Sequence, residues 1–304
     1  MDSLTTDMIR FRFFFYAFSL ALVTASIVVL AAWGLPLGID FTGGSLLEVN
    51  FVGENPTQER DQVNLTEAFS RFSIQPQVQN VDDDALVLRF REMSEDDHRV
   101  LIAELKEKNP TLREQRFESI GPTIGQETRD KSVVAMALVI GTILVYVAWA
   151  FRKLSHPLAS WQYGLVTVVT LVHDVIVTVG FVVVLTHITG RDVGVAFVAA
   201  LLTVLGYSVN DTIVVFDRIR ENLSRATAKL DFSELVNRSL RETFVRSLNA
   251  SLTTILVLLA VLVMGGETVF VFLATLVGGI AIGTYSSLFL ASPLVVDWAK
   301  KSKK

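Results

Sequence analysis

The sequence predicts an α-helical membrane protein with six transmembrane helices and an α+β ferredoxin-like external domain between helices 1 and 2. Three observations lead to this fold class. Of 304 residues, 51% are hydrophobic and only 19% are charged, whereas soluble domains carry about 25% charged residues. The mean hydropathy is +0.48. The apolar residues form six long blocks, and one long charged stretch separates the first block from the second. An ordinary soluble globule is excluded.

Each apolar block approaches the length of a membrane span. A spanning helix needs about 20 mostly apolar residues, because hydrocarbon satisfies none of its backbone polar groups. The first block is longer than a signal-peptide core and lacks a clean cleavage site, so we expect a retained anchor. The fifth is short, and we expect its helix to start upstream, within residues 246–249. The six predicted spans are residues 13–33, 133–151, 163–186, 193–216, 252–265 and 269–291.

The distribution of lysine and arginine predicts the orientation of the chain. Cytoplasmic loops carry an excess of these residues, a rule that holds for short loops. With the N-terminus inside, the outer short loops hold only Arg191. Both termini are then cytoplasmic, with residues 1–34 as N-terminus and first helix, 35–131 as external domain and 132–304 as helices 2–6. The basic residues on the inner side are Arg10, Arg12, Arg152, Lys153, Arg218, Arg220, Arg225, Lys229, Arg238, Arg241, Arg246, Lys300, Lys301, Lys303 and Lys304.

The external stretch reads as β-α-β-β-α-β, which is the ferredoxin-like order. A β-rich segment precedes a segment with helical apolar spacing, and two strand-like runs follow, joined by the turn-forming Asp82-Asp83-Asp84. Ser94 then caps a helix with acids in its first turn. We expect His98, near the start of that helix, to be solvated. The predicted elements are 45–52, 62–72, 75–81, 85–91, a helix after Ser94 that ends at 109–110, and 113–120.

Motifs for enzymatic chemistry are missing, so we expect neither catalysis nor a cofactor. The chain has no cysteine, which excludes disulfides, thiolate catalysis and cysteine-ligated metals. It has no P-loop, no glycine-rich dinucleotide motif opening a helix and no zinc-protease motif. The segment GIDFTGG at 38–44 is interpreted as a structural motif: Gly43 and Gly44 can take positive φ as the chain enters the sheet, near Asp40. The net charge of −4 gives no indication of nucleic acid as a partner.

Polar residues inside the apolar blocks are the candidate site. A charge at the bilayer centre costs about 2.5–3.5 kcal/mol on insertion scales. Asp174 and Asp211 could each be neutral or be ionised against a cation such as Arg246. The candidate polar residues are His173 and Asp174 in the third span, Ser208, Asn210, Asp211 and Thr212 in the fourth, and Arg246 at the approach to the fifth.

Each candidate also has a structural interpretation. A helix-to-helix hydrogen bond explains Asp174 as well as a transport role does. For Asp211 the clustering of polar neighbours favours function. Arg246 by itself would be an anchor on the inner side. Gly279 and Gly283 form a small-xxx-small pattern, which indicates close helix packing.

Several motifs together resemble one family. They are GIDFTGG at 38–44, IGPTIGQE at 120–127, LVHDV at 171–175, GYSVNDTIVVFDRIREN at 206–222 and GTYSS at 283–287. They resemble the signatures of the SecF family, the smaller subunit of the bacterial SecD-SecF protein-export complex. The resemblance runs from the first span to the end of the sixth, and residues 210–222 are its most specific part. Phe216 departs from the pattern, since family members often have a small polar residue there.

The resemblance implies a mechanism and a set of partners. It implies half of a resistance-nodulation-division transporter in a bacterial inner membrane, where intramembrane carboxylates and a basic residue use the proton or sodium gradient to promote late steps of export. The matching positions are Asp211 and Arg246, with Asp174 as a further coupling residue. The implied partners are SecD, the SecYEG translocon, YajC, the translocating preprotein and membrane lipid.

Two other classes of protein stay open. A half-size exporter of small molecules or lipids from the same superfamily would share the charged spans, although such exporters usually carry about twice as many spans. A structural membrane scaffold without coupling would tolerate neutralisation of Asp211 or Arg246.

Overall fold

The computed structural model describes residues 8–52, 57–58, 65–80, 85–152, 158–226 and 231–302. The chain divides into two compact units. The membrane unit comprises residues 1–35, 134–188 and 196–304, and the sheet unit comprises residues 36–133 and 189–195. The sheet unit is therefore entered twice by the chain, the second time by a short loop.

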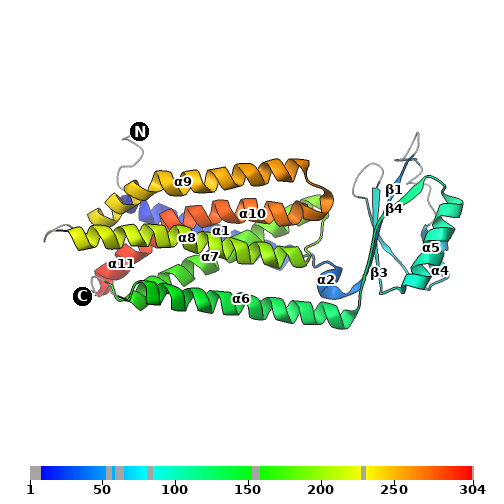
Figure 1. Ribbon diagram of the computed structural model, residues 1–304, viewed down its shortest axis with the longest axis horizontal. Helices are drawn as coiled ribbons and strands as arrows, with labels where there is room; N and C mark the ends of the chain where they lie inside the picture. The colour runs from blue at the N-terminus through cyan, green and yellow to red at the C-terminus, as the bar shows by residue number, and fades with distance from the viewer. Residues whose placement is uncertain are drawn as a thin grey trace. The chain divides into compact units, whose positions relative to one another are not determined.

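The described residues contain six helices that are long and apolar enough to cross a membrane, which confirms the predicted number. Figure 1 shows the helices of the membrane unit running side by side along its length. The spanning helices are α1 (Arg12–Trp33), α6 (Pro122–Ala150), α7 (Ser160–Thr189), α8 (Val195–Arg225), α9 (Phe232–Met264) and α10 (Glu267–Ser286), which continues through a π-helical turn (Ser287–Ala291) into α11 (Ser292–Ser302).

Most helices extend beyond the apolar blocks that predicted them. The fifth span begins upstream as expected, although at Phe232 and so earlier than residues 246–249. Its first turns pack through Leu235, Val236 and Leu240 into a buried cluster with Tyr163 and Phe216. That packing stabilises helix well outside the apolar block, because most helical stability in proteins comes from tertiary burial.

The spans differ in how much apolar surface they bury. α7, α8 and the last span bury far more of their apolar stretch than α1, α6 and α9. The buried helices carry the polar residues described below. The exposed helices present leucine, valine and phenylalanine outward, as lipid or a partner requires.

The sheet unit is a four-stranded antiparallel sheet with strand order β2-β3-β1-β4. That order and the element sequence are ferredoxin-like, which confirms the predicted fold class. α4 and α5 lie on one face of the sheet (Figure 1). The elements are β1 (Gly44–Phe51), α4 (Leu65–Ser70), β2 (Gln77–Asn80), β3 (Ala85–Phe90), α5 (Glu95–Lys108) and β4 (Leu112–Ile120).

Alternate residues of the strands build the core of this unit. Leu47, Val49 and Leu88 are fully buried beneath Leu101 and Leu105 of α5. Ser94 caps α5 as predicted, since its hydroxyl accepts a hydrogen bond from the backbone N–H of Asp97. The predicted turn at Asp82-Asp83-Asp84, and residues 62–64 of the predicted helix, lie outside the described residues.

The prediction that His98 is solvated is wrong. The side chain is 6% exposed, its ring stacks on Phe117 with centroids 3.7 Å apart, and Nε2 lies 3.0 Å from a carboxylate oxygen of Glu114. The reason is helical geometry. His98 precedes Leu101 by three residues and Leu105 by seven, so it shares the face of α5 that covers the sheet.

Candidate functional site

Two buried carboxyl groups lie in the middle of the membrane unit, on neighbouring helices. Asp174 is on α7 and is fully buried, and Asp211 is on α8 and is 4% exposed. Hydroxyl groups from α8, α9 and α10 surround them. Isolated charges are expensive in hydrocarbon, so the partners of each carboxyl group decide what it can do.

Asp174 is held by three polar side chains. Its Oδ1 lies 2.9 Å from Nδ1 of His173. Its Oδ2 accepts hydrogen bonds from Ser208 of α8 at 2.5 Å and from Ser286 of α10 at 2.8 Å. The structure thus joins three predicted residues, His173, Asp174 and Ser208, and adds Ser286. This cluster links three spanning helices at one carboxyl group.

Asp211 has looser partners. Its Oδ2 accepts from Thr284 of α10 at 3.3 Å and from Ser251 of α9 at 3.5 Å. The two hydroxyl groups lie 2.5 Å from one another, and the carbonyl one turn earlier in its own helix is an alternative acceptor for the single hydrogen of each. A hydrogen shared among these groups can therefore lie between several pairs of oxygen atoms. The carboxylate of Asp211 itself accepts only long hydrogen bonds.

Thr212 connects α8 to the π-helical turn. Its hydroxyl lies 2.8 Å from that of Ser287, and both hydroxyls also donate to the backbone carbonyl of Ser208. π-helical turns inside α-helices occur frequently at functional sites. Here the turn follows directly after Thr284 and Ser286, the residues that reach the two carboxyl groups.

Sequence reasoning did not identify Ser251, Thr284, Ser286 or Ser287 as site residues. A usable signal existed: four consecutive residues that carry hydroxyl groups stand at 284–287, in an otherwise apolar span. Hydroxyl groups in helices commonly bond to their own backbone. Which of them turn toward another helix depends on packing that the sequence pattern does not contain.

The structure does not bring Arg246 to Asp211. Arg246 is exposed on α9, and among the described residues it forms no ion pair. The separation of the two side chains within this chain has a geometric reason. Ser247 and Ser251, one turn apart, are buried on the face of α9 that meets α8, and a neighbouring position is rotated by about 100°. Asn210 is likewise exposed, beside Asp211 on α8.

Two glycines of the last span let α10 approach α8 closely. A Cβ atom on Gly279 would lie 2.3 Å from Val204, and one on Gly283 would lie 2.9 Å from Ser208. Both distances are shorter than real Cβ contacts. The close approach places Thr284 and Ser286 within reach of the carboxyl groups.

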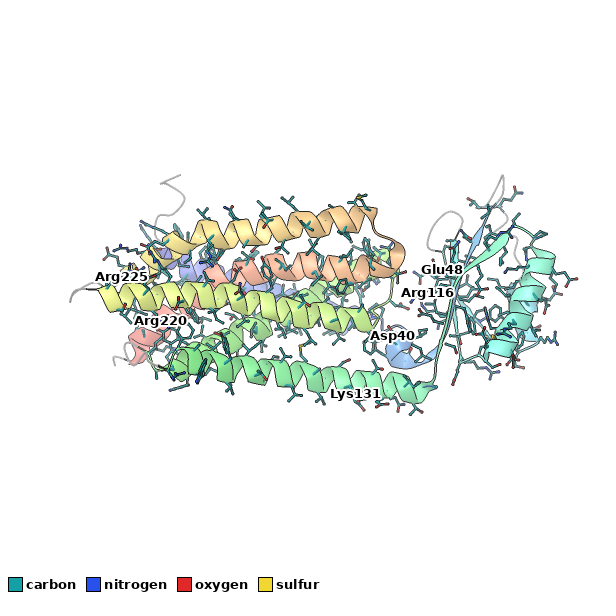
Figure 2. All side chains as sticks on the ribbon, viewed as in Figure 1. Asp40, Glu48, Arg116, Lys131, Arg220 and Arg225 are labelled. Atoms are coloured by element: carbon teal, nitrogen blue, oxygen red, sulfur yellow. The ribbon has the colours of Figure 1, made fainter. Side chains whose placement is uncertain are left out.

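The GIDFTGG segment forms a tight structural corner in the sheet unit. α2 (Ile39–Thr42) is a single helical turn, where only a turn was expected. Gly43 and Gly44 have φ of +72° and +115°, and a Cβ on either would lie 2.7 Å from backbone atoms of Pro122 or Phe90. Asp40, labelled in Figure 2, accepts a hydrogen bond from the backbone N–H of Val195 at 2.7 Å.

The loop at 189–195 is bonded into the same unit. Gly38 and Val193 pair through their backbones at 2.9 Å, and Arg89 of β3 lies 2.5 Å from a carboxylate oxygen of Asp192. Burial raises the pKa of the Asp192 carboxyl group, and the Arg89 guanidinium opposes that shift. Gln79 of β2 donates to the carbonyl of Gly190. These bonds hold the loop within the sheet unit.

Basic side chains gather at the other end of α8. Arg220 and Arg225 are labelled there in Figure 2. Arg218 pairs with Glu221 and, across to α9, with Glu242 at 2.6 Å. Arg220 pairs with Asp217. Among the described residues, no group of three or more histidine, aspartate or glutamate side chains is arranged to hold a metal ion.

Comparison with known proteins identifies the same regions. A family model described as the C-terminal part of the protein export membrane proteins SecD/SecF matches residues 100–301. A second, the SecD/SecF GG motif, matches residues 28–52, which include the corner at Gly43 and Gly44.

Two relatives that match nearly the whole chain are both named protein translocase subunit SecF. A protein translocase subunit SecF of Thermobaculum terrenum is 41% identical over 97% of this chain and 94% of its own length. The SecF subunit of Anaerolinea thermophila is 38% identical over 94% of this chain and 92% of its own. The crystal structure of SecDF from Thermus thermophilus, a translocon-associated membrane protein, matches with a TM-score of 0.79 and 32% identity. The match covers 96% of this chain but 38% of that longer one.

Proposed function

The chain belongs to the SecF family of protein translocase subunits, and from that premise we propose that it uses an ion gradient, together with a SecD-type subunit, to promote late steps of protein export. A role in the Sec pathway follows from the family. The proposal concerns the energy source and the residues that use it. The coupling ion is a proton or sodium.

One observation carries the proposal: Asp211 is buried in the middle of the membrane unit among hydroxyl groups alone. No cation is bonded to it among the described residues. Binding of a proton neutralises a carboxylate whose charge is costly there, and releases Ser251 and Thr284 to bond elsewhere. α8, α9 and α10 meet at this group, so their packing has two arrangements that differ by one ion.

The position of Arg246 leads to a proposal about the SecD-type partner subunit. It lies about midway along α9 with its side chain exposed, and Asn249 and Thr253 follow on the same exposed side. A guanidinium that borders the apolar part of a spanning helix is stabilised by a protein or water environment with a counter-charge. We assign that environment to the SecD-type subunit, which corresponds to the part of SecDF that this chain does not cover.

The family also supports a setting for this machinery. The chain is a multi-pass membrane protein, and the proposed location is the bacterial cytoplasmic membrane with both termini in the cytoplasm. The SecYEG translocon, YajC and the translocating preprotein are the proposed further partners. Asp174 is the second proposed coupling residue.

The test is Asp211→Asn in the full chain with its SecD-type partner. The substitution preserves shape and removes titration, so gradient-stimulated export into inverted vesicles should be lost while insertion and complex formation persist. Asp217→Asn is the matched control, since Asp217 is exposed at the end of the same helix and its loss should leave the rate unchanged.

Ionophores separate the two ions in this assay. A protonophore should abolish the stimulation if protons are used, and a sodium ionophore should abolish it if sodium is used. Wild-type export by Asp211→Asn, still sensitive to the ionophore, would move the coupling site away from Asp211. Export that is insensitive to both ionophores, in the wild type and in every variant, would indicate a scaffold without coupling.

A further inference from the structure

His173 is a buried titratable side chain that the proposal above does not use. It lies in the middle of α7 and is 5% exposed. Within the described part of the chain, Nε2 of its ring is buried and has no hydrogen-bond partner. A buried polar atom without a partner is unusual in folded proteins and calls for an explanation.

The other ring nitrogen fixes the state of the imidazole. Nδ1 lies 2.9 Å from Oδ1 of Asp174. The second oxygen of that carboxyl group already accepts from Ser208 and Ser286. With Asp174 ionised, which the hydrogen bonds from Ser208 and Ser286 favour, Nδ1 carries the hydrogen and donates it to Asp174, and this tautomer leaves the lone pair on Nε2.

We propose that His173 and Asp174 form a second proton-binding station, in which an incoming proton binds to the lone pair of His173 Nε2. Nδ1 keeps its own hydrogen bonded to Asp174 throughout. An imidazole beside a carboxylate carries a net charge of −1, and the imidazolium beside the same carboxylate carries zero. Uptake of one proton thus neutralises a pair that is buried within the membrane unit.

The groups around the station suit that uptake. From α8 it meets Ser208, and Asp211 lies three residues further along the same helix, bonded to α9 and α10 instead. From α10 it meets Ser286 and Tyr285, whose ring centroid lies 6.4 Å from that of His173. The Tyr285 hydroxyl is bonded to Ser19 and to the backbone of α1. No lysine or arginine side chain is bonded to His173 or Asp174 among the described residues, so no fixed cation opposes the proton.

The residues that bond to Asp174 lie on α8 and α10, within one helical turn of Asp211 or of a residue that bonds to it. On α10, Ser286 reaches Asp174 and Thr284, two residues earlier, reaches Asp211. On α8, Ser208 and Asp211 are less than one turn apart. A proton at either carboxyl site changes the hydrogen bonds that hold the same two helices. This consequence for export rests on the proposed function, whereas proton binding at His173 does not.

The direct test is nitrogen NMR of the full chain with its SecD-type partner in vesicles, labelled at histidine. The chain has four histidines, and the signal absent from His173→Gln belongs to His173. On acidification that signal should change from neutral imidazole to imidazolium. Asp174→Asn should abolish the change. His187→Gln, which alters an exposed histidine stacked on Trp33, should leave it intact.

The change in the signal is observed in the unaltered protein, and His173→Gln serves to assign that signal. A His173 signal that stays that of neutral imidazole on acidification overturns the proposal and leaves a structural hydrogen bond. The two proposals also fail separately. In the NMR experiment, Asp211→Asn should retain the change in the His173 signal. In the export assay, a wild-type rate for Asp211→Asn would contradict the coupling role of Asp211 and leave the proposal for His173 intact. In the export assay His173→Gln should lower gradient-stimulated export several-fold at unchanged complex formation.

Discussion

Asp174 and Asp211 are both buried in the membrane unit, but their partners differ in strength. Asp174 has contacts between 2.5 and 2.9 Å from three helices, while the contacts of Asp211 are 3.3 and 3.5 Å. Short bonds favour one fixed arrangement. Longer bonds to hydroxyls that have other acceptors are exchanged at little cost. Of the two carboxyl groups, Asp211 is thus the one whose hydrogen bonds rearrange more readily.

Arg246 gives a prediction at the same scale. Arg246→Met should abolish gradient-stimulated export, because it removes the charge that the partner subunit would meet. Arg246→Lys keeps the charge but loses the planar fork of donors, and should be partly defective. The measurement is export into inverted vesicles at matched protein levels.

Arg241 on the same helix provides the comparison, since it is also exposed and lies closer to the basic end of α9. Arg241→Lys should retain full activity. Equal activity of Arg246→Met and the wild type would show that Arg246 serves only as an anchor on the inner side.

Among the elements, the last span departs most from a regular helix. Five residues, Ser287–Ala291, form a π-helical turn between α10 and α11. Before that turn, α10 presents Gly279, Gly283, Thr284 and Ser286 to α7 and α8. The small residues and the hydroxyl residues therefore have one joint role, which is close packing with specific polar contacts.

The sheet unit gives a prediction at the scale of elements. A soluble fragment of residues 44–120 contains all four strands with both helices, so it should fold alone, as its continuous core implies. Its stability should be marginal, because so small a domain buries a limited share of its surface. Circular dichroism and thermal unfolding would measure both.

A matched fragment of residues 36–133 adds the corner at Gly43 and Gly44, and should be the more stable of the two. A spectrum of disordered chain for both fragments would show that the sheet requires the loop at 189–195 or a partner.

The elements were largely predictable from sequence, and the contacts between them were not. Long apolar blocks determine six spans, and the alternation of residues determines the strands around Leu47 and Leu88. His98 was predicted wrongly although its spacing to Leu101 contained the answer. The direction of Arg246 and the partners of Thr284 depend on how helices rotate against one another. Apolar periodicity is too weak to predict that rotation in spans that are apolar on nearly all sides.

For the whole molecule, the prediction concerns topology. Reporter fusions after Gly34 and Gly190 should report the outer side, and fusions after Lys153, Lys229 and Lys304 the cytoplasmic side, because lysine and arginine concentrate there. Alkaline phosphatase and green fluorescent protein fusions measure the two sides. Reporters that place Lys229 and Lys304 on opposite sides would contradict the six-span topology.

The double entry of the chain into the sheet unit has a consequence for the order in which the chain connects its helices. The chain passes between the two units at four places, near residues 35, 133, 188 and 195. α6 passes through one of them as an unbroken helix, and α7 and α8 end at two others. α7 and α8 also carry Asp174 and Asp211, so the two helices with the buried carboxyl groups are joined directly by a loop that belongs to the sheet unit.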